Sequence, residues 1–203
     1  MTSMSLESRI GTASTDSVLN SAYDVLPMGL AYVAPNKTVN IQGSDRPYEH
    51  TSEAQTMDGI VKDYLHSDEG KRFMDYAHSR GRKFIQLVGA GSADLGEHVV
   101  AAVIHDGEKG VIVSNYDGKD FRSRVSEFAS MYGINQEVAL EYVLTHEFGH
   151  IAGYNTEESN ERFVGEYFME MAGKTQGTQK QKYEQLAAVA QQRETEAKYT
   201  ENN

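Results

Sequence analysis

The chain has 203 residues, which suits one domain with loose ends and is long enough to bury a sizeable core. Its formal net charge of −11 would repel a phosphate backbone, so we expect no nucleic-acid partner. It contains no cysteine, which excludes disulfides and thiol nucleophiles and restricts any metal site to His, Asp and Glu ligands.

The N-terminal stretch shows no targeting signal. It lacks the basic start and apolar run of a signal peptide, and nowhere in the chain do about eighteen apolar residues follow one another. We therefore expect a cytoplasmic protein with no membrane partner, although export without a cleaved signal would leave the same pattern. Residues 1–20 are rich in Ser and Thr, which predicts a disordered leader.

The first half of the chain predicts short strands followed by two helices. Residues 31–33 and 38–41 are β-compatible runs separated by a Pro-Asn turn signal. Apolar residues then recur at helical intervals, which predicts one helix over 53–66 and a second over 67–79.

The middle of the chain favours extended structure. The apolar run over 83–88 predicts a strand, and the runs over 98–105 and 111–116 predict a β-hairpin. Between them, the glycine-rich segment 89–96 is expected to be a flexible loop. It is not expected to bind a dinucleotide, because a strand follows it where that motif needs a helix N-terminus.

Three helices are predicted next. The first covers 122–132, the second is capped by Asn135 and runs to Gly153, and the third begins after Thr156. The tail, 174–203, is polar and Gln-rich, and its few apolar residues allow either a loosely docked helix or a free segment.

The second of these helices carries the motif His146-Glu147-Phe148-Gly149-His150. Residues four apart stack on one helical face, so both imidazoles can reach one ion in the nitrogen environment that zinc favours. Glu147 lies roughly 100° around from His146, where it can receive a proton from metal-bound water without binding the metal. The spacing predicts a zinc-dependent hydrolytic site.

The surroundings of the motif support this interpretation. Apolar residues at intervals of three or four form a stripe away from both histidines, which lets the helix pack on a core while it presents ligands to a cleft; they are Leu140, Leu144, Phe148 and Ile151. The competing interpretation is a chance motif on a solvated face, which we expect roughly 2% of the time in a chain of this composition.

A third protein ligand is required, because catalytic zinc usually has three ligands and a water. The next helix offers several acids, and its apolar residues define an inward face. Glu157 lies about 50° from the centre of that face, Glu161 about 90° and Glu158 about 150°. We therefore favour Glu157, with Glu161, Glu158 or a distant acid as alternatives. Glu161 can instead hydrogen-bond a ligand histidine and fix its tautomer.

The segment from Val111 to Met169 resembles the metal-binding core of the ImmA/IrrE-type metallopeptidases, a gluzincin-like family. The likeness rests on the hairpin sequence VIVSN, the helix EYVLTHEFGH, and a later helix in which Glu157 precedes Phe163 and Met169. It implies that Glu157 is the third ligand and that the reaction is limited cleavage of a regulatory protein. Metzincins place that ligand where Thr156 stands here, a poor zinc ligand, which argues against that class.

Together these features predict an α+β, zincin-like domain over 21–173, with a small mixed or antiparallel sheet packed on the motif helix. We expect a zinc metallopeptidase that hydrolyses peptide bonds by metal-activated water with Glu147 as general base. Its substrate would be a protein or peptide, and either hairpin strand could pair with it. The oxyanion-stabilising residue is left open among Tyr154, Tyr167 and His105. The alternative function is a zinc-stabilised regulatory or binding protein without catalysis.

Overall fold

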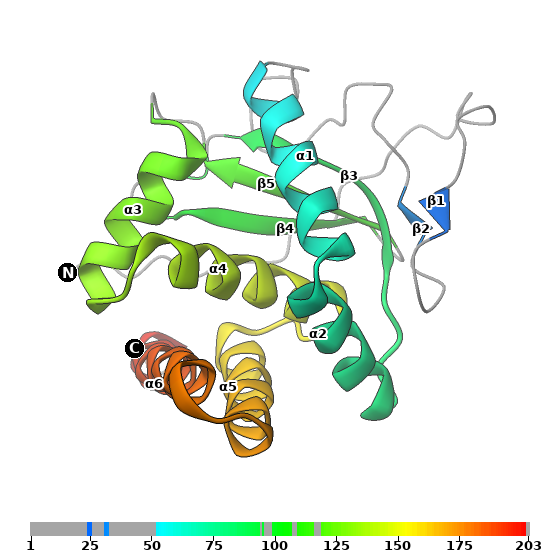
Figure 1. Cartoon of the computed structure of the whole chain (residues 1–203). Coiled ribbons are helices and arrows are strands. Elements are labelled where there is room, and N and C mark those ends of the chain that lie inside the picture. The colour runs from blue at the N-terminus through cyan, green and yellow to red at the C-terminus, as the bar shows by residue number, and fades with distance from the viewer. Residues whose placement is uncertain are drawn as a thin grey trace.

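The computed structural model describes residues 24–25, 31–32, 52–93, 95, 99–106, 109–115 and 119–201. These residues form an α+β fold, in which one sheet packs against helices (Figure 1). The predicted leader over 1–20 and the β-compatible run over 38–41 lie outside the described residues. None of the helices within these ranges is long and apolar enough to cross a membrane.

The sheet is mixed, and its described strands are ordered β1-β2-β3-β5-β4. β4 (Ala101–Asp106) and β5 (Lys109–Asn115) pair antiparallel, which confirms the predicted hairpin. β3 (Gln86–Ala93) pairs parallel with β5 and with β2 (Ala31–Tyr32), and β2 pairs antiparallel with β1 (Asp24–Val25). β5 is therefore paired on both sides, whereas β4 ends the described sheet.

The glycine-rich segment 89–96 is not the loop that its composition predicts, because β3 continues through it to Ala93. Parallel pairing with β5 stabilises this extended backbone, and such a non-local contact leaves no mark on local composition. The expected strand start at 83 is also too early. There the backbone N–H of Ile85 donates to the carbonyl of Ile151, at 2.9 Å, and so ties the approach to β3 to the end of the motif helix.

Two helices run one after the other before the sheet. α1 (Ser52–His66) lies across one face of the sheet, and α2 (Asp68–Ser79) continues beyond it toward the C-terminal helices (Figure 1). Ser67 separates them and caps α2, since its hydroxyl accepts a hydrogen bond from the N–H of Gly70 at 3.0 Å. Both helices agree with the predicted ranges.

The three helices predicted from the second half are α3 (Phe121–Tyr132), α4 (Gln136–Ile151) and α5 (Glu157–Lys174). Each begins after a capping side chain that accepts a backbone N–H bond from three residues further on, and the caps are Asp120, Asn135 and Thr156. α3 ends at Gly133, whose φ of 65° is the left-handed conformation that glycine adopts readily.

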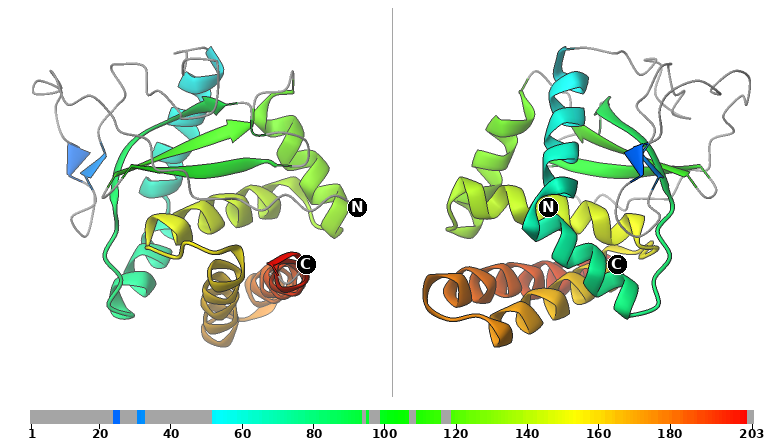
Figure 2. Two further views of the ribbon diagram at one scale, coloured as in Figure 1. Left: turned by 180° about the vertical axis from the view of Figure 1, so that it is seen from behind. Right: turned by 45° about the vertical axis from the view of Figure 1, so that its right-hand side comes forward.

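The polar tail forms a long helix, α6 (Gly177–Glu201), which lies alongside α5 in both views of Figure 2. Of the two possibilities that the sequence leaves open, the docked helix is the one observed. Its apolar side chains are buried in the core that it forms with α5 and α4; they include Tyr183, Leu186, Ala187, Val189 and Ala190.

α4 is the centre of the packing. The predicted apolar stripe is buried at Leu144, Phe148 and Ile151 and half-buried at Leu140. The opposite side of α4, which carries both histidines, is covered as well, because α5 and α6 pack below it (Figure 1). The motif therefore lies in the interior of the protein and not on a solvated face.

Candidate metal centre

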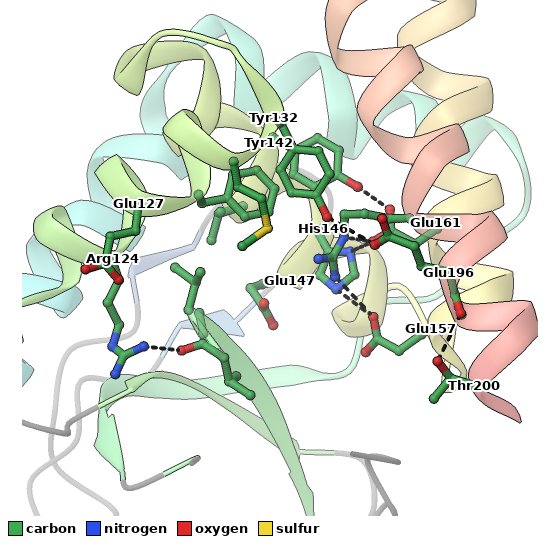
Figure 3. A pocket seen from close by; sticks show the side chains of 18 of the residues that line it. Arg124, Glu127, Tyr132, Tyr142, His146, Glu147, Glu157, Glu161, Glu196 and Thr200 are labelled. Carbon is green, nitrogen blue, oxygen red and sulfur yellow. Dashed lines mark hydrogen bonds and ion pairs between the residues drawn. The ribbon is translucent and has the colours of Figure 1, made fainter. Parts of the chain in front are cut away.

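Three predicted ligands meet at one point. The Nε2 atoms of His146 and His150, one turn apart on α4, lie 3.2 Å from each other. The carboxylate of Glu157, at the first residue of α5, places Oε2 3.3 Å from Nε2 of His146 and Oε1 3.3 Å from Nε2 of His150. Figure 3 shows the carboxylate of Glu157 pointing at the His146 ring. These three residues form a group that could hold a metal ion.

The short connection between α4 and α5 reverses the chain and so brings Glu157 next to the two histidines of α4. Gly153 has a φ of 91°, a left-handed conformation that reverses the chain directly after α4. The Thr156 hydroxyl then accepts the N–H of Ser159 at 3.2 Å and starts α5. The carbonyl of Tyr154 accepts a hydrogen bond from Nδ1 of His150 at 2.6 Å, so the turn also orients a candidate ligand.

Both imidazoles are oriented by their second nitrogen. Nδ1 of His146 lies 3.1 Å from a carboxylate oxygen of Glu161, and the amide of Asn160 donates to the His146 carbonyl at 2.9 Å. Nδ1 faces Glu161 in His146 and a backbone carbonyl in His150, so in each ring Nε2 is the nitrogen left to bind an ion, and the two Nε2 atoms face the same point. The contact with Glu161 is the one that its helical spacing predicts.

The spacing of these atoms fits a zinc ion. Ligand atoms at two corners of a tetrahedron around zinc, each about 2.0–2.1 Å from it, lie about 3.3 Å apart. Here the two Nε2 atoms lie 3.2 Å apart, and each lies 3.3 Å from one of the two carboxylate oxygens of Glu157. Two imidazole nitrogens and one carboxylate oxygen are also a donor set that zinc accepts. The two histidines and Glu157 could therefore supply three ligands to a zinc ion and leave its fourth position to another ligand.

Charge also favours a cation at this point. Burial lowers the pKa of His146, but the carboxylates of Glu161 and Glu157 more than offset this and raise it to about 10. For Glu157, burial alone would raise the pKa of the carboxyl group, but the two nearby histidines outweigh this effect and hold that pKa well below its usual range. The site therefore concentrates negative charge where a cation would bind.

Glu147 is placed differently from the ligands. Its side chain is buried on the same helix, and burial raises the pKa of its carboxyl group despite the nearby histidines. One of its oxygens, Oε2, is buried with no hydrogen-bond partner among the described residues. An unsatisfied buried carboxylate oxygen is costly, so its position indicates a purpose other than stability.

A cleft of about 400 Å³ adjoins this site. It is bounded by α3, α4, the start of β4, the start of α5 and the last turns of α6 (Figure 3). Both His146 and Glu147 line it, together with Glu157. The exposed side chain of Met131 stands at its edge.

The other predicted site residues lie elsewhere. Glu158 pairs with Arg162 at 2.5 Å and with Lys198 at 4.0 Å, and it does not belong to the group that could hold a metal ion. The ring of Tyr154 stacks on Phe163, and Tyr167 is fully buried in the aromatic core. Neither tyrosine lines the cleft. The side chain of the remaining oxyanion candidate, His105, lies outside the described part of the structure.

Sequence reasoning missed three residues around the ligands: Tyr142, Asn160 and Arg193. Tyr142 and Arg193 both hydrogen-bond Glu161. For two of the three, the sequence contains a pattern that could have indicated their position near the ligands. Tyr142 stands one turn before His146, and Arg193 extends the buried stripe of α6 three residues beyond Ala190. Asn160 is one residue from Glu161 and had no such pattern.

Comparison with known proteins finds no family model, curated protein or solved structure that matches this chain. The likeness to the ImmA/IrrE-type metallopeptidases therefore stays a prediction from the motifs, and the function must be argued from the site itself.

Proposed function

We propose that the chain is a zinc-dependent metallopeptidase with a zincin-like active site, which cleaves protein or peptide substrates by limited proteolysis. The observation that carries the proposal is the convergence of His146, His150 and Glu157 beside a buried carboxylate and an adjoining cleft. When bound there, a zinc ion would polarise the scissile carbonyl and lower the pKa of a water molecule.

Glu147 is the general base in this proposal. Glu147 follows His146 directly on α4 and lines the cleft. Its Oε2 accepts no hydrogen bond from the described residues, so it could accept the proton of a water molecule without losing an existing bond. A carboxyl group whose pKa is raised by burial accepts a proton more readily than an exposed one. It would take the proton of the attacking water and pass it to the leaving amine as the peptide bond breaks.

β4 is the strand that we propose to hold the substrate. Of the two hairpin strands considered from the sequence, β5 is excluded because it is paired with β3 and β4. β4 ends the described sheet, and its first residue, Ala101, lines the cleft together with Val99 and Val100. An extended peptide added along this edge would run past Glu147 and the ligands.

A zinc-stabilised binding protein remains the competing function. It requires a closed metal site, because structural zinc has four protein ligands. The described residues bring together three groups that could bind a metal ion, and a cleft adjoins them. The buried carboxylate of Glu147 would also have no role in such a protein, so we favour catalysis.

The test uses the purified full chain and a library of unstructured peptides. We expect about one zinc ion per chain, and Glu147→Gln should keep the zinc while cleavage falls at least about 100-fold. Glu158→Gln is the matched control, since Glu158 is an acid on the next helix that faces away from the site, and it should keep both properties. Folded protein without zinc, or undiminished cleavage by Glu147→Gln, would overturn the proposal.

A further inference from the structure

The C-terminal helix α6 places a positively charged arginine side chain beside the proposed metal ligands. Arg193, on α6, donates from Nε to a carboxylate oxygen of Glu161. Its Nη2 lies 3.7 Å from Oε2 of Glu157. A helix that the sequence predicts only as a polar tail therefore contacts one proposed metal ligand and the residue that orients another.

Glu161 is the link between Arg193 and the histidines. Only 1% of its side chain is exposed, and it faces Nδ1 of His146 at 3.1 Å. The same oxygen, Oε1, receives the bond from Arg193, while Oε2 accepts the hydroxyl of Tyr142. A buried carboxylate keeps its orientation only when its oxygens are held by donors, and a charged donor holds it most strongly.

We propose that Arg193 is a positioning residue for the metal centre. It fixes the carboxylate of Glu161, which in turn fixes the ring of His146 with Nε2 directed at the ion. This inference rests on the proposed function only in requiring that His146 binds a metal. It makes α6 a part of the site, since Arg193 acts on His146 from a position 47 residues further along the chain.

The chain offers a matched control for this contact. A second ion pair joins the same two helices, between Nε of Arg162 on α5 and Glu194 on α6, at 3.0 Å. Its arginine is half exposed, and neither partner lines the cleft. Removing this pair changes the contact between α5 and α6 without touching the metal centre.

The experiment measures the affinity of the metal-free full chain for Zn²⁺ by competition with a chromophoric chelator. It also records the visible spectrum of the Co²⁺-loaded protein. Arg193→Gln, which removes the charge but keeps a polar side chain, should weaken Zn²⁺ binding about 10–100-fold and alter the Co²⁺ spectrum. Arg193→Lys should recover part of the affinity, because it restores the charge. Arg162→Met should leave both readings unchanged.

A double-mutant cycle shows whether Arg193 acts through Glu161. The combined Arg193→Gln and Glu161→Gln variant should bind Zn²⁺ no more weakly than the worse single variant. Losses that add, or an affinity of Arg193→Gln within about twofold of the unmodified chain, would overturn the inference. If Arg193→Gln does not fold, equal affinities of Arg193→Lys and Arg162→Met would contradict it.

These outcomes are distinct from failure of the proposed function. A chain that binds no Zn²⁺ in any form defeats both proposals. A chain that binds Zn²⁺ through Arg193 and Glu161 but cleaves no peptide supports this inference and defeats the peptidase alone.

Discussion

Gly149, inside the motif, is predicted to be intolerant of even one methyl group. α4 and α5 approach so closely that a Cβ at this position would lie 1.9 Å from Oδ1 of Asn160 and 3.3 Å from a methyl group of Val164. Asn160 cannot move aside cheaply, because it is fully buried and its amide donates to the His146 carbonyl at 2.9 Å. Gly149→Ala should therefore force the two helices apart.

The expected size follows from these contacts. Overpacking costs about 1–3 kcal/mol, and loss of the Asn160 hydrogen bond adds about 1 kcal/mol. The helix propensity of Ala offsets about 1 kcal/mol of this, so the net loss should be about 1–3 kcal/mol. For a chain of this size that lowers the melting temperature by roughly 2–12 °C.

The assay is thermal unfolding followed by circular dichroism, with a chelator present so that metal binding does not contribute. Gly173→Ala is the control, because Gly173 is also helical and nothing lies within 4 Å of its added Cβ. It should leave stability unchanged or raise it by up to about 1 kcal/mol. A Gly149→Ala protein as stable as the unmodified chain would refute the close approach of α4 and α5.

Three further predictions concern the proposed ligands and a partly buried ion pair between Lys182 and Glu141. Glu157→Gln should weaken Zn²⁺ binding at least about tenfold in a chelator competition, and Glu158→Gln should not. Because the raised pKa of His146, about 10, keeps its ring protonated at neutral pH, Zn²⁺ must displace a proton, so affinity should rise about tenfold per pH unit between about pH 7 and 9. Lys182→Met should cost roughly 1–3 kcal/mol in urea unfolding, because Lys182 holds Glu141 at 2.6 Å. That loss should shrink on acidification, since burial raises the pKa of Glu141 and protonation removes its charge.

Each of these has a contradicting result. Equal losses for Glu157→Gln and Glu158→Gln would mean that the first turn of α5 acts only through its general charge. An affinity that does not change with pH would mean that His146 is unprotonated before Zn²⁺ binds, contrary to the charge around it. A Lys182→Met loss that grows at low pH would show that Glu141 is not the partner that matters.

The grouping of His146, His150 and Glu157 was predictable because its geometry follows largely from local helical spacing. The two histidines share a face at any position four apart, and the caps Asn135 and Thr156 were visible as residue types at the right places. The helical wheel also selected Glu157. It ranked burial wrongly, since Glu161 is 1% exposed and Glu157 29%. The reason is that α6 covers the side of α5 on which Glu161 lies, and the pattern of apolar residues in α5 alone does not indicate this contact.

What the sequence did not predict depends on contacts between distant segments. α6 is rich in Gln, Lys and Glu, and only its packing against α5 shows that it completes the site with Arg193. Likewise, β3 passes through glycines that suggest a loop, and it is extended because β5 pairs with it. Local composition cannot report either contact, because each is formed by residues far apart in the chain.

The most direct test of the account is diffraction at the zinc absorption edge from crystals of the zinc-loaded chain. We predict one anomalous peak in contact with Nε2 of His146, Nε2 of His150 and the carboxylate of Glu157, with its fourth position open to the cleft beside Glu147. A peak at any other place, or a zinc ion closed off by a fourth protein ligand, would contradict the account.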